Sequence, residues 1–324
     1  MFSLRITELL PIANRIMEWS LAVKEGEQVL ILVDIETDPL LIESLCAATR
    51  IARAEPTVVT IRPTKVAGED PGPIAVRAME AADVVISPAW PALGHSNSVR
   101  KLREAKRIRY MSMPGITSEM IVKGGGSADY QEVFEISQRL VNVLNKAKMI
   151  NVKTSLGTDL TASIENMPYR VGAALAREPG MIACFPDGEA WGAPVEGTAY
   201  GKVVIDCSLT IFGLVREPVV CYVEKGRVVD VQGGSQAKEV KQLISQIANA
   251  DNIAEIAIGT NPASIITGII SEEKKGLGRV HVALGNNLML GGKTESKLHL
   301  DGVMLEPTVT VDDQIIVEDG EVKI

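Results

Sequence analysis

The chain has 324 residues, which is more than one hydrophobic core usually supports and therefore favours two domains. Hydrophobic residues make up 46% of the chain and charged residues 23%, as in an ordinary globular protein. The formal net charge of −8 argues against a nucleic-acid partner and against an anionic membrane surface, because phosphates and acidic lipids repel such a chain.

Cysteine usage and the first residues predict a location in the cytoplasm. The cysteines show no CxxC spacing, and Cys46 and Cys207 lie in apolar surroundings, which is typical of free thiols in a reducing compartment. The opening segment MFSLRITELLPIANRIMEWSLAVKEGE lacks the pattern of a signal peptide and predicts an amphipathic helix. No stretch reaches the roughly 18 apolar residues that a membrane span needs.

Strands alternate with helices in the amino-terminal half. QVLILVD (28–34) predicts a buried strand, and DPLLIESLCAATRIARA (38–54) predicts a helix capped by Asp38. TVVTIRP, ADVVISPA and RIRYMSMPG predict further strands, with helices around 75–81 and 97–106. Strands joined by helices imply crossover connections, so we expect a mostly parallel sheet covered on both faces.

The pattern changes after a long helix predicted at 129–148. MINVKTSLGTDLTASI and PVVCYVEKGRVVDVQGG predict β-hairpins, and TVTVDDQIIVEDGEVKI predicts a β-meander. A single helix near 236–248 interrupts these strands. We therefore expect an α/β domain over residues 1–148 and a β-rich α+β domain over residues 149–324.

The amino-terminal half lacks a recognisable nucleotide site. The first strand leads into VDIETDP, which has no glycine-rich turn for a phosphate, and KGGGSADY has glycines without the GxGxxG spacing. His95 precedes a helix that we expect to start near Ser96, and a capping or surface role is the plainer interpretation. The alternative is a catalytic side chain presented at the carboxyl end of the ADVVISPA strand, where open α/β sheets place ligand contacts.

Two of the three histidines lie close together in HVALGNNLMLGGKTESKLHLDG. In KLHLDG, His299 and Asp301 alternate with Leu298 and Leu300, so on a strand both polar side chains point to the same face. His281 begins an apolar segment and can meet them from a neighbouring strand. Imidazole nitrogen and carboxylate oxygen side by side suit Zn, Mn, Fe or Co, and the pattern predicts a metal site.

Two glutamates extend this candidate site. Glu255 lies in the apolar segment IAEIAIG, where an unpaired charge would cost several kcal/mol. Glu189 follows the turn FPDG. The alternative interpretation pairs Glu255 with a lysine or arginine and leaves His281 as a core histidine. A metal site accounts for all of these residues together and is the favoured interpretation.

The motifs FPDGEAWGAP, AEIAIGTNP, HVALGNN and HLDG resemble those of thermophilic metalloaminopeptidases, the aminopeptidase T and aminopeptidase S family with its leucyl aminopeptidase-like relatives. The resemblance covers the carboxy-terminal half. It implies two metal ions, with Glu255 bridging them, and the ligands Glu189, Glu255, His281, His299 and Asp301.

The chain departs from these peptidases at Leu288, which stands where their active-site tyrosine is expected. The segment GHSNSVRKLREAKRIRYMSMPGITSEM is more similar to a second branch of the superfamily, the iron-dependent 2,5-dihydroxypyridine 5,6-dioxygenases. Such an oxygenase uses two histidines and one carboxylate, which His281, His299 and Asp301 supply. A dinuclear hydrolase needs both glutamates as well.

Because both glutamates are present, the sequence favours a metal-dependent hydrolase of the aminopeptidase type that cleaves a small peptide or amide. It would use two Zn, Co or Mn ions, with Glu189, Glu255 and His95 as catalytic candidates. The alternatives are a ring-opening dioxygenase that uses one Fe(II) on a small aromatic substrate, and a catalytically silent small-molecule binding protein. The resemblance also implies a homodimer formed through the carboxy-terminal half.

Overall fold

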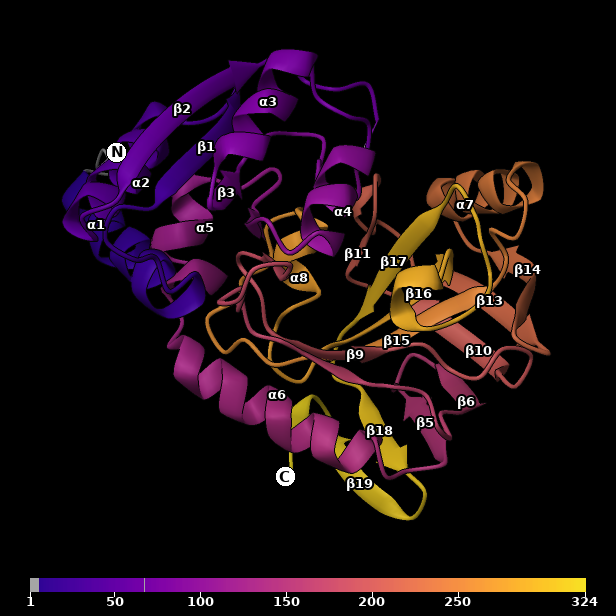
Figure 1. Cartoon of the computed structure of the whole chain (residues 1–324). Helices are drawn as coiled ribbons and strands as arrows, with labels where there is room; N and C mark the ends of the chain where they lie inside the picture. Colours follow the sequence, from indigo (N-terminus) through magenta and orange to yellow (C-terminus); the bar gives the residue numbers. More distant parts are fainter. Residues whose placement is uncertain (1–5, 67) are drawn as a thin grey trace. The chain divides into compact units, whose positions relative to one another are not determined.

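The computed structural model describes residues 6–66 and 68–324 (Figure 1). The chain forms two compact units. Unit 1 contains the described part of Met1–Tyr130 together with Ala173–Asp187, and unit 2 contains Gln131–Gly172 and Gly188–Ile324. The boundary predicted at residue 148 falls inside unit 2, because unit 2 begins at Gln131, and the chain later returns to unit 1 over Ala173–Asp187.

Unit 1 is an α/β unit built on a parallel sheet, in agreement with the predicted fold class. The strand order is β2-β1-β3-β4-β8, and every pair is parallel. In β1 every residue after the first is buried, as expected for a strand covered on both faces. The strands are β1 (Gln28–Asp34), β2 (Glu55–Ile61), β3 (Val84–Ser87), β4 (Arg109–Ser112) and β8 (Ile182–Cys184).

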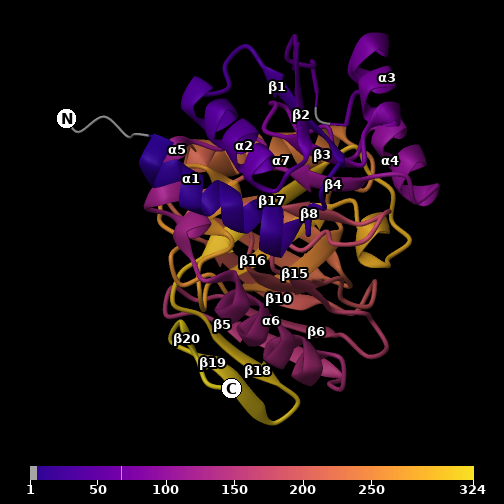
Figure 2. The same ribbon diagram turned by 60° about the vertical axis from the view of Figure 1, so that its left-hand side comes forward.

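Helices cover both faces of this sheet (Figure 2). Asp38 caps α2 by accepting a hydrogen bond from the backbone N–H of Leu40 at 2.9 Å, which confirms the predicted cap. Met79 of α3 and Val99 of α4 pack into a buried cluster with Leu30 of β1. The helices are α1 (Ile6–Arg15), which continues as a π-helix (Ile16–Ser20), α2 (Pro39–Ile51), α3 (Pro73–Ala81), α4 (Asn97–Glu104) and α5 (Ser118–Val122).

Unit 2 contains two large antiparallel sheets. The first has the order β14-β13-β10-β6-β5-β18-β19-β20, and the second has the order β12-β11-β17-β16-β15-β9-β7. The first is formed by β5 (Met149–Lys153), β6 (Asp159–Ser163), β10 (Tyr200–Ile205), β13 (Val219–Glu224), β14 (Arg227–Gln232), β18 (Thr308–Val311), β19 (Gln314–Glu318) and β20 (Glu321–Val322). The second is formed by β7 (Arg170–Gly172), β9 (Glu189–Gly192), β11 (Ser208–Leu209), β12 (Gly213–Leu214), β15 (Ile253–Gly259), β16 (Val280–Gly285) and β17 (His299–Met304).

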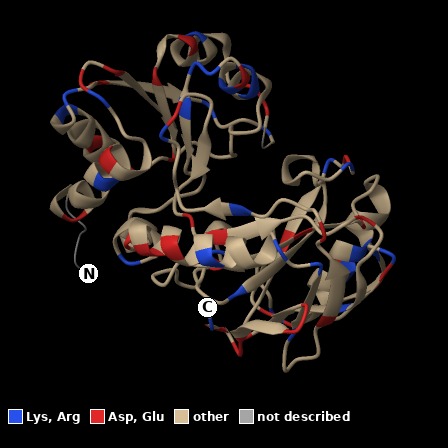
Figure 3. Cartoon of the chain, turned by 60° about the horizontal axis from the view of Figure 1, so that its bottom comes forward, with Lys and Arg blue, Asp and Glu red and all other residues tan. Residues whose placement is uncertain are grey.

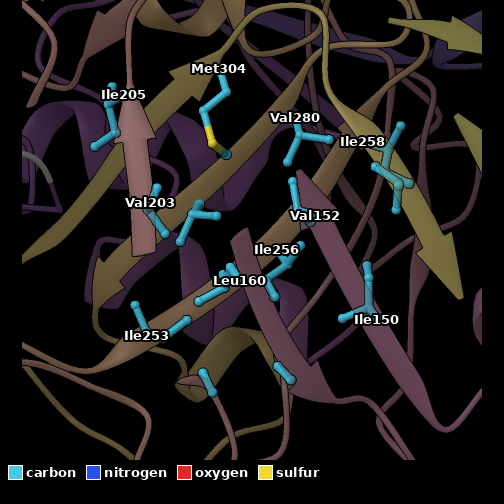
Figure 4. Close-up of a cluster of buried hydrophobic side chains, with 14 of the residues drawn as sticks. Ile150, Val152, Leu160, Val203, Ile205, Ile253, Ile256, Ile258, Val280 and Met304 are labelled. Carbon is cyan, nitrogen blue, oxygen red and sulfur yellow. The ribbon is translucent and has the colours of Figure 1, made fainter. Parts of the chain in front are cut away.

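The core of unit 2 is an apolar cluster to which both sheets contribute (Figure 4). Ile150, Val152 and Leu160 come from the first sheet, and Ile256 and Val280 come from the second. Two helices, α6 (Tyr130–Leu144) and α7 (Ser235–Gln246), add apolar side chains to the same cluster. Because strand residues alternate between faces, the residues between the core positions of β15, β16 and β17 lie on the opposite face of the second sheet.

Acidic and basic residues are interspersed along the elements of both units (Figure 3). Within residues 6–66 and 68–324, no helix combines the length and the apolar composition that crossing a membrane requires.

Candidate metal centre

Four neighbouring strands of the second sheet place the five predicted ligands on one face. Ala190, Ile256, Val282 and Leu300 belong to the core cluster, so the residues that alternate with them point the other way. The strands adjoin in the order β17-β16-β15-β9, which brings their side chains together. The residues on this face are Glu189 (β9), Glu255 (β15), His281 (β16), and His299 and Asp301 (β17).

Their ligand atoms lie within a few ångströms of one another. His299 Nε2 is 3.1 Å from Glu255 Oε2 and 3.3 Å from Asp301 Oδ1. His281 Nε2 is 3.6 Å from Glu255 Oε1, 3.7 Å from Glu189 Oε2 and 4.0 Å from Asp301 Oδ1. The residues form two groups that can each hold an ion, Glu255–His299–Asp301 and Glu189–Glu255–His281, and Glu255 belongs to both.

Several of these atoms are buried without a hydrogen-bond partner. His281 is fully buried, and neither of its ring nitrogens makes a hydrogen bond. Glu189 Oε2 and Asp301 Oδ1 are also buried and also lack a hydrogen-bond partner. Each unsatisfied buried polar atom costs about 1–3 kcal/mol. A divalent cation would satisfy these atoms together, so the donor set fits a metal ion.

The ring of His299 is oriented by a hydrogen bond from the nitrogen that points away from the carboxylates. Its Nδ1 lies 2.9 Å from the carbonyl oxygen of Asn286, so the Nδ1–H group donates there and Nε2 faces the carboxylates. A hydrogen bond from the second ring nitrogen is the usual way in which proteins hold a metal-binding histidine. Partial burial by itself would lower the pKa of His299, but Asp301 and Glu255 outweigh it and raise that pKa to about 10. Without a cation the imidazole therefore keeps a proton at Nε2, which a metal ion displaces.

Asp301 is held in place through its backbone and through its side chain. Its backbone N–H donates to Thr210 Oγ1 at 3.0 Å, and its Oδ2 accepts from Lys274 Nζ at 3.1 Å. Burial alone would raise the pKa of Asp301, but Lys274 and His299 outweigh it and keep that pKa well below its usual range. The Asp301 carboxylate is therefore ionised, and its Oδ1 remains directed at the two histidines.

Two lysines at this site were not predicted from the sequence. Lys274 pairs with Asp301, and the nearly buried Lys275 donates a hydrogen bond to Glu189 Oε1. Both follow the short helix α8 (Ile270–Glu273). In the sequence, SEEKKG has the charge pattern of a solvated helix turn, so nothing in it indicates buried lysines. The turn is fixed by Glu273, whose buried carboxylate accepts backbone N–H groups of the loop, including that of Ile269 at 3.1 Å.

The charges of the cluster favour one ion over two. Three carboxylates face two ammonium groups, which leaves one net negative charge when the histidines are neutral. One divalent ion changes that to one net positive charge, whereas two ions would leave three positive charges on a largely buried face. Unbalanced buried charge is strongly unfavourable.

His95 belongs to unit 1, where it is exposed. It follows the carboxyl end of β3 and directly precedes Ser96, whose Oγ caps α4 by accepting from Val99 N–H at 3.4 Å. The strand order reverses between β1 and β3, and open α/β sheets bind ligands at such a point. Asp34, at the end of β1, fixes the loop after β3 by accepting a hydrogen bond from the backbone N–H of Trp90 at 2.6 Å.

Leu288, which stands where the aminopeptidases are expected to have a tyrosine, lies in unit 2. It is the first residue of a 3-10 helix and is half exposed.

The family model and the curated relative name the same family, and two solved structures share the fold. The family model described as 2,5-dihydroxypyridine 5,6-dioxygenase matches residues 8–324. A 2,5-dihydroxypyridine 5,6-dioxygenase of Pseudomonas putida strain KT2440 is 25% identical over 263 residues, which cover 76% of this chain and 73% of that protein. Among solved structures, the 2,5-dihydroxypyridine dioxygenase of the same strain has a TM-score of 0.84 at 20% identity, with 99% of this chain and 98% of that chain covered. AmpT from Thermus thermophilus has a TM-score of 0.72 at 15% identity, with 98% and 99% covered.

The family model identifies the dioxygenase branch of the predicted superfamily, and the two solved structures show that both branches share this fold. They overturn the predicted activity. The chain is not assigned to the hydrolases, aminopeptidases or metallopeptidases, since the family model and the curated relative both name the dioxygenase. The prediction relied on the presence of Glu189 and Glu255, but Glu189 is engaged by Lys275. The chain belongs to the 2,5-dihydroxypyridine 5,6-dioxygenase family of enzymes.

Proposed function

We propose that the protein is an Fe(II)-dependent dioxygenase that opens the ring of a dihydroxypyridine, with one iron held by His281, His299 and Asp301. The observation that carries this proposal is the position of Asp301 Oδ1, which has no hydrogen-bond partner and lies within 4.0 Å of Nε2 of both histidines. Two histidines and one carboxylate with open positions form the ligand set of non-haem Fe(II) oxygenases.

When bound, Fe(II) supplies the open coordination positions and the redox capacity that allow dioxygen to react with an aromatic ring. The chain's own residues prepare this centre. Asn286 holds His299 in the tautomer that presents Nε2, and Glu255 lies against both histidines and fixes their rings. Thr210 and Lys274 hold Asp301.

The charge of the site supports a hydroxylated aromatic ring as the substrate class. With one divalent ion bound, the three carboxylates and two lysines leave one net positive charge on a largely buried face. A dihydroxypyridine that loses a hydroxyl proton carries one negative charge and compensates it. A neutral peptide offers no such compensation.

We test this function by loading the protein with Fe(II) under anaerobic conditions and then adding 2,5-dihydroxypyridine and dioxygen. About one iron per chain and consumption of about one dioxygen per substrate are expected, because a single triad binds one ion. The same protein loaded with Zn(II) is the control and is expected to consume no dioxygen. An iron-loaded protein that leaves the dioxygen concentration unchanged would contradict the proposal.

We also propose that His95 transfers a proton to or from the substrate. Its support is its exposed position in the loop that joins the carboxyl end of β3 to α4, and β3 adjoins the reversal in strand order. Replacing His95 by alanine should lower kcat/KM by about 100- to 10,000-fold, the usual contribution of a positioned acid or base, with the iron content unchanged. Asn97→Ala, on the exposed first turn of α4, is the matched control. Full activity of the His95 variant would refute this role.

We also propose that the protein forms a homodimer through unit 2. Unit 2 carries large apolar side chains that are exposed in the single chain, among them Ile211, Leu288 and Met289. Apolar groups of this kind on a surface favour association. Light scattering at micromolar protein concentration is expected to give twice the mass of the chain. A monomeric mass with full iron occupancy would rule the dimer out.

A further inference from the structure

An arginine lies on the same face of the second sheet as the proposed iron ligands. Arg170 of β7 pairs in register with Trp191 of β9, and Trp191 pairs with Ala257 of β15. Ala257 in turn pairs with His281 of β16. Val171, the next residue along β7, packs against the apolar core, so Arg170 points to the opposite face. A single row of side chains therefore runs across four strands, from His281 to Arg170.

The guanidinium group of Arg170 is held in place by two neighbours. Its central carbon lies 5.3 Å from the centroid of the Trp191 ring, within the range of a cation–π interaction. A Cβ atom added to Gly291 would lie 4.0 Å from Nη2, so this nitrogen faces the loop between β16 and β17. The same loop contains Asn286, whose carbonyl oxygen orients the ring of His299. One loop thus lies beside the arginine and beside an expected iron ligand.

The other terminal nitrogen of this guanidinium lacks a partner. Nη1 of Arg170 is buried and makes no hydrogen bond. Within residues 6–66 and 68–324, Arg170 also forms no ion pair, whereas Lys274 and Lys275 are each paired with a carboxylate of the site. An unpartnered buried polar group is unfavourable, and more so when it is charged. A ligand oxygen would satisfy Nη1, because arginine binds oxyanions through its N–H groups.

We propose that Arg170 binds the end of the substrate that points away from the iron, by donating a hydrogen bond from Nη1 to a substrate oxygen. The inference rests on the proposed function, which places the iron at His281. The two oxygens of 2,5-dihydroxypyridine are para to each other, so one can bind at the metal while the other reaches Arg170. The site therefore selects rings with two para oxygens, and the guanidinium charge favours their anionic form.

The length of the row agrees with this arrangement. His281 and Arg170 are three strand spacings apart, and spacings of about 4.8 Å separate their backbones by about 14 Å. An arginine side chain and a six-membered ring together are long enough to bridge that distance. Ala257, which lies between them in the row, contributes only a methyl group.

The experiment measures binding without turnover, in the full-length protein loaded with Zn(II). Isothermal titration calorimetry gives the dissociation constant of 2,5-dihydroxypyridine for wild type and for Arg170→Met. The variant should bind about 10- to 100-fold more weakly, which is what a hydrogen bond to a charged group contributes. Its zinc content should equal that of wild type, because Arg170 is not a metal ligand.

Two controls make the result specific. 3-Hydroxypyridine keeps only one of the two oxygens, so it should bind at the metal and show the same affinity for wild type and for Arg170→Met. Arg177→Met is the matched variant. Arg177 also lies over a tryptophan ring, 4.1 Å from the centroid of Trp19, but it belongs to unit 1 and its Nε donates to the Trp19 carbonyl oxygen at 2.6 Å. Arg177→Met should bind 2,5-dihydroxypyridine as wild type does.

A second variant covers a loss of folding. If the melting temperature or the zinc content of Arg170→Met falls, Arg170→Lys is used in its place. Lysine keeps the charge but has no group at the position of Nη1, so about 10-fold weaker binding is expected.

The outcomes separate this inference from the proposed function. Wild-type affinity in a folded Arg170 variant would overturn the role of Arg170, and so would an equal loss of affinity for 3-hydroxypyridine. Wild type that binds no 2,5-dihydroxypyridine would overturn both the inference and the proposed substrate class. Weakened binding in Arg170→Met, beside an iron-loaded wild type that consumes no dioxygen, would support the role of Arg170 and refute the proposed reaction.

Discussion

His299→Ala is expected to abolish iron binding and to remove activity in proportion to the iron lost. His299 Nε2 lies within 3.3 Å of both Glu255 and Asp301, so its loss would remove a ligand of the proposed site and leave two carboxylates close together. Loss of a residue that merely supports a metal ligand costs about 10- to 100-fold in affinity, so loss of a ligand should cost more than about 100-fold. The measurement is iron content after anaerobic loading, together with the far-ultraviolet circular dichroism spectrum.

The fold should survive this change, because the His299 side chain is 36% exposed and is not part of the apolar core. Lys297→Ala, two residues earlier on the exposed approach to β17, is the matched control and should keep its iron. Normal iron content in the His299 variant would remove the central ligand from the proposed site.

Glu255→Gln is expected to weaken iron binding by about 10- to 100-fold, which is less than the loss of His299. The carboxylate of Glu255 lies between the two histidines, 3.1 Å from His299 Nε2 and 3.6 Å from His281 Nε2. Glutamine keeps the shape but removes the charge that fixes both rings. Titration of the apoprotein with Fe(II) under anaerobic conditions measures the change.

A different result for Glu255→Gln would assign it a different role. If the melting temperature falls while the iron affinity stays at the wild-type value, Glu255 is a structural partner of the histidines and not part of the metal site. Glu196→Gln is the matched control, since Glu196 is a carboxylate of the same unit that binds a loop through Asn287 and Thr294. It should leave the iron affinity unchanged.

Local patterns were sufficient to predict much of the fold and the grouping of the site residues. Alternation in KLHLDG placed His299 and Asp301 on one face, and the structure has them on β17 with Leu300 in the core. The apolar segment around Glu255 predicted a buried strand, which is β15. These features depend on the two-residue period of a strand and on burial, and both are visible in the sequence.

Features that depend on long-range packing could not be predicted from the sequence. The return of Ala173–Asp187 to unit 1 depends on pairing of β8 with β4, which are far apart in the chain. The inward turn of Lys274 and Lys275 depends on buried hydrogen bonds of Glu273 and on the packing of Gly259. The prediction of a two-ion hydrolase counted the negative charges of the two glutamates. It did not count the positive charges of Lys274 and Lys275, and this omission led to the wrong activity.

The most direct test of the account is the reaction of the iron-loaded protein with 2,5-dihydroxypyridine under 18O2. A ring-opening dioxygenase places both atoms of one dioxygen molecule in the product, and mass spectrometry of the ring-opened product is expected to show two 18O atoms. The reaction is quenched early so that exchange with water does not remove the label. A product that carries no 18O, or an intact ring after full consumption of dioxygen, would contradict the proposed function.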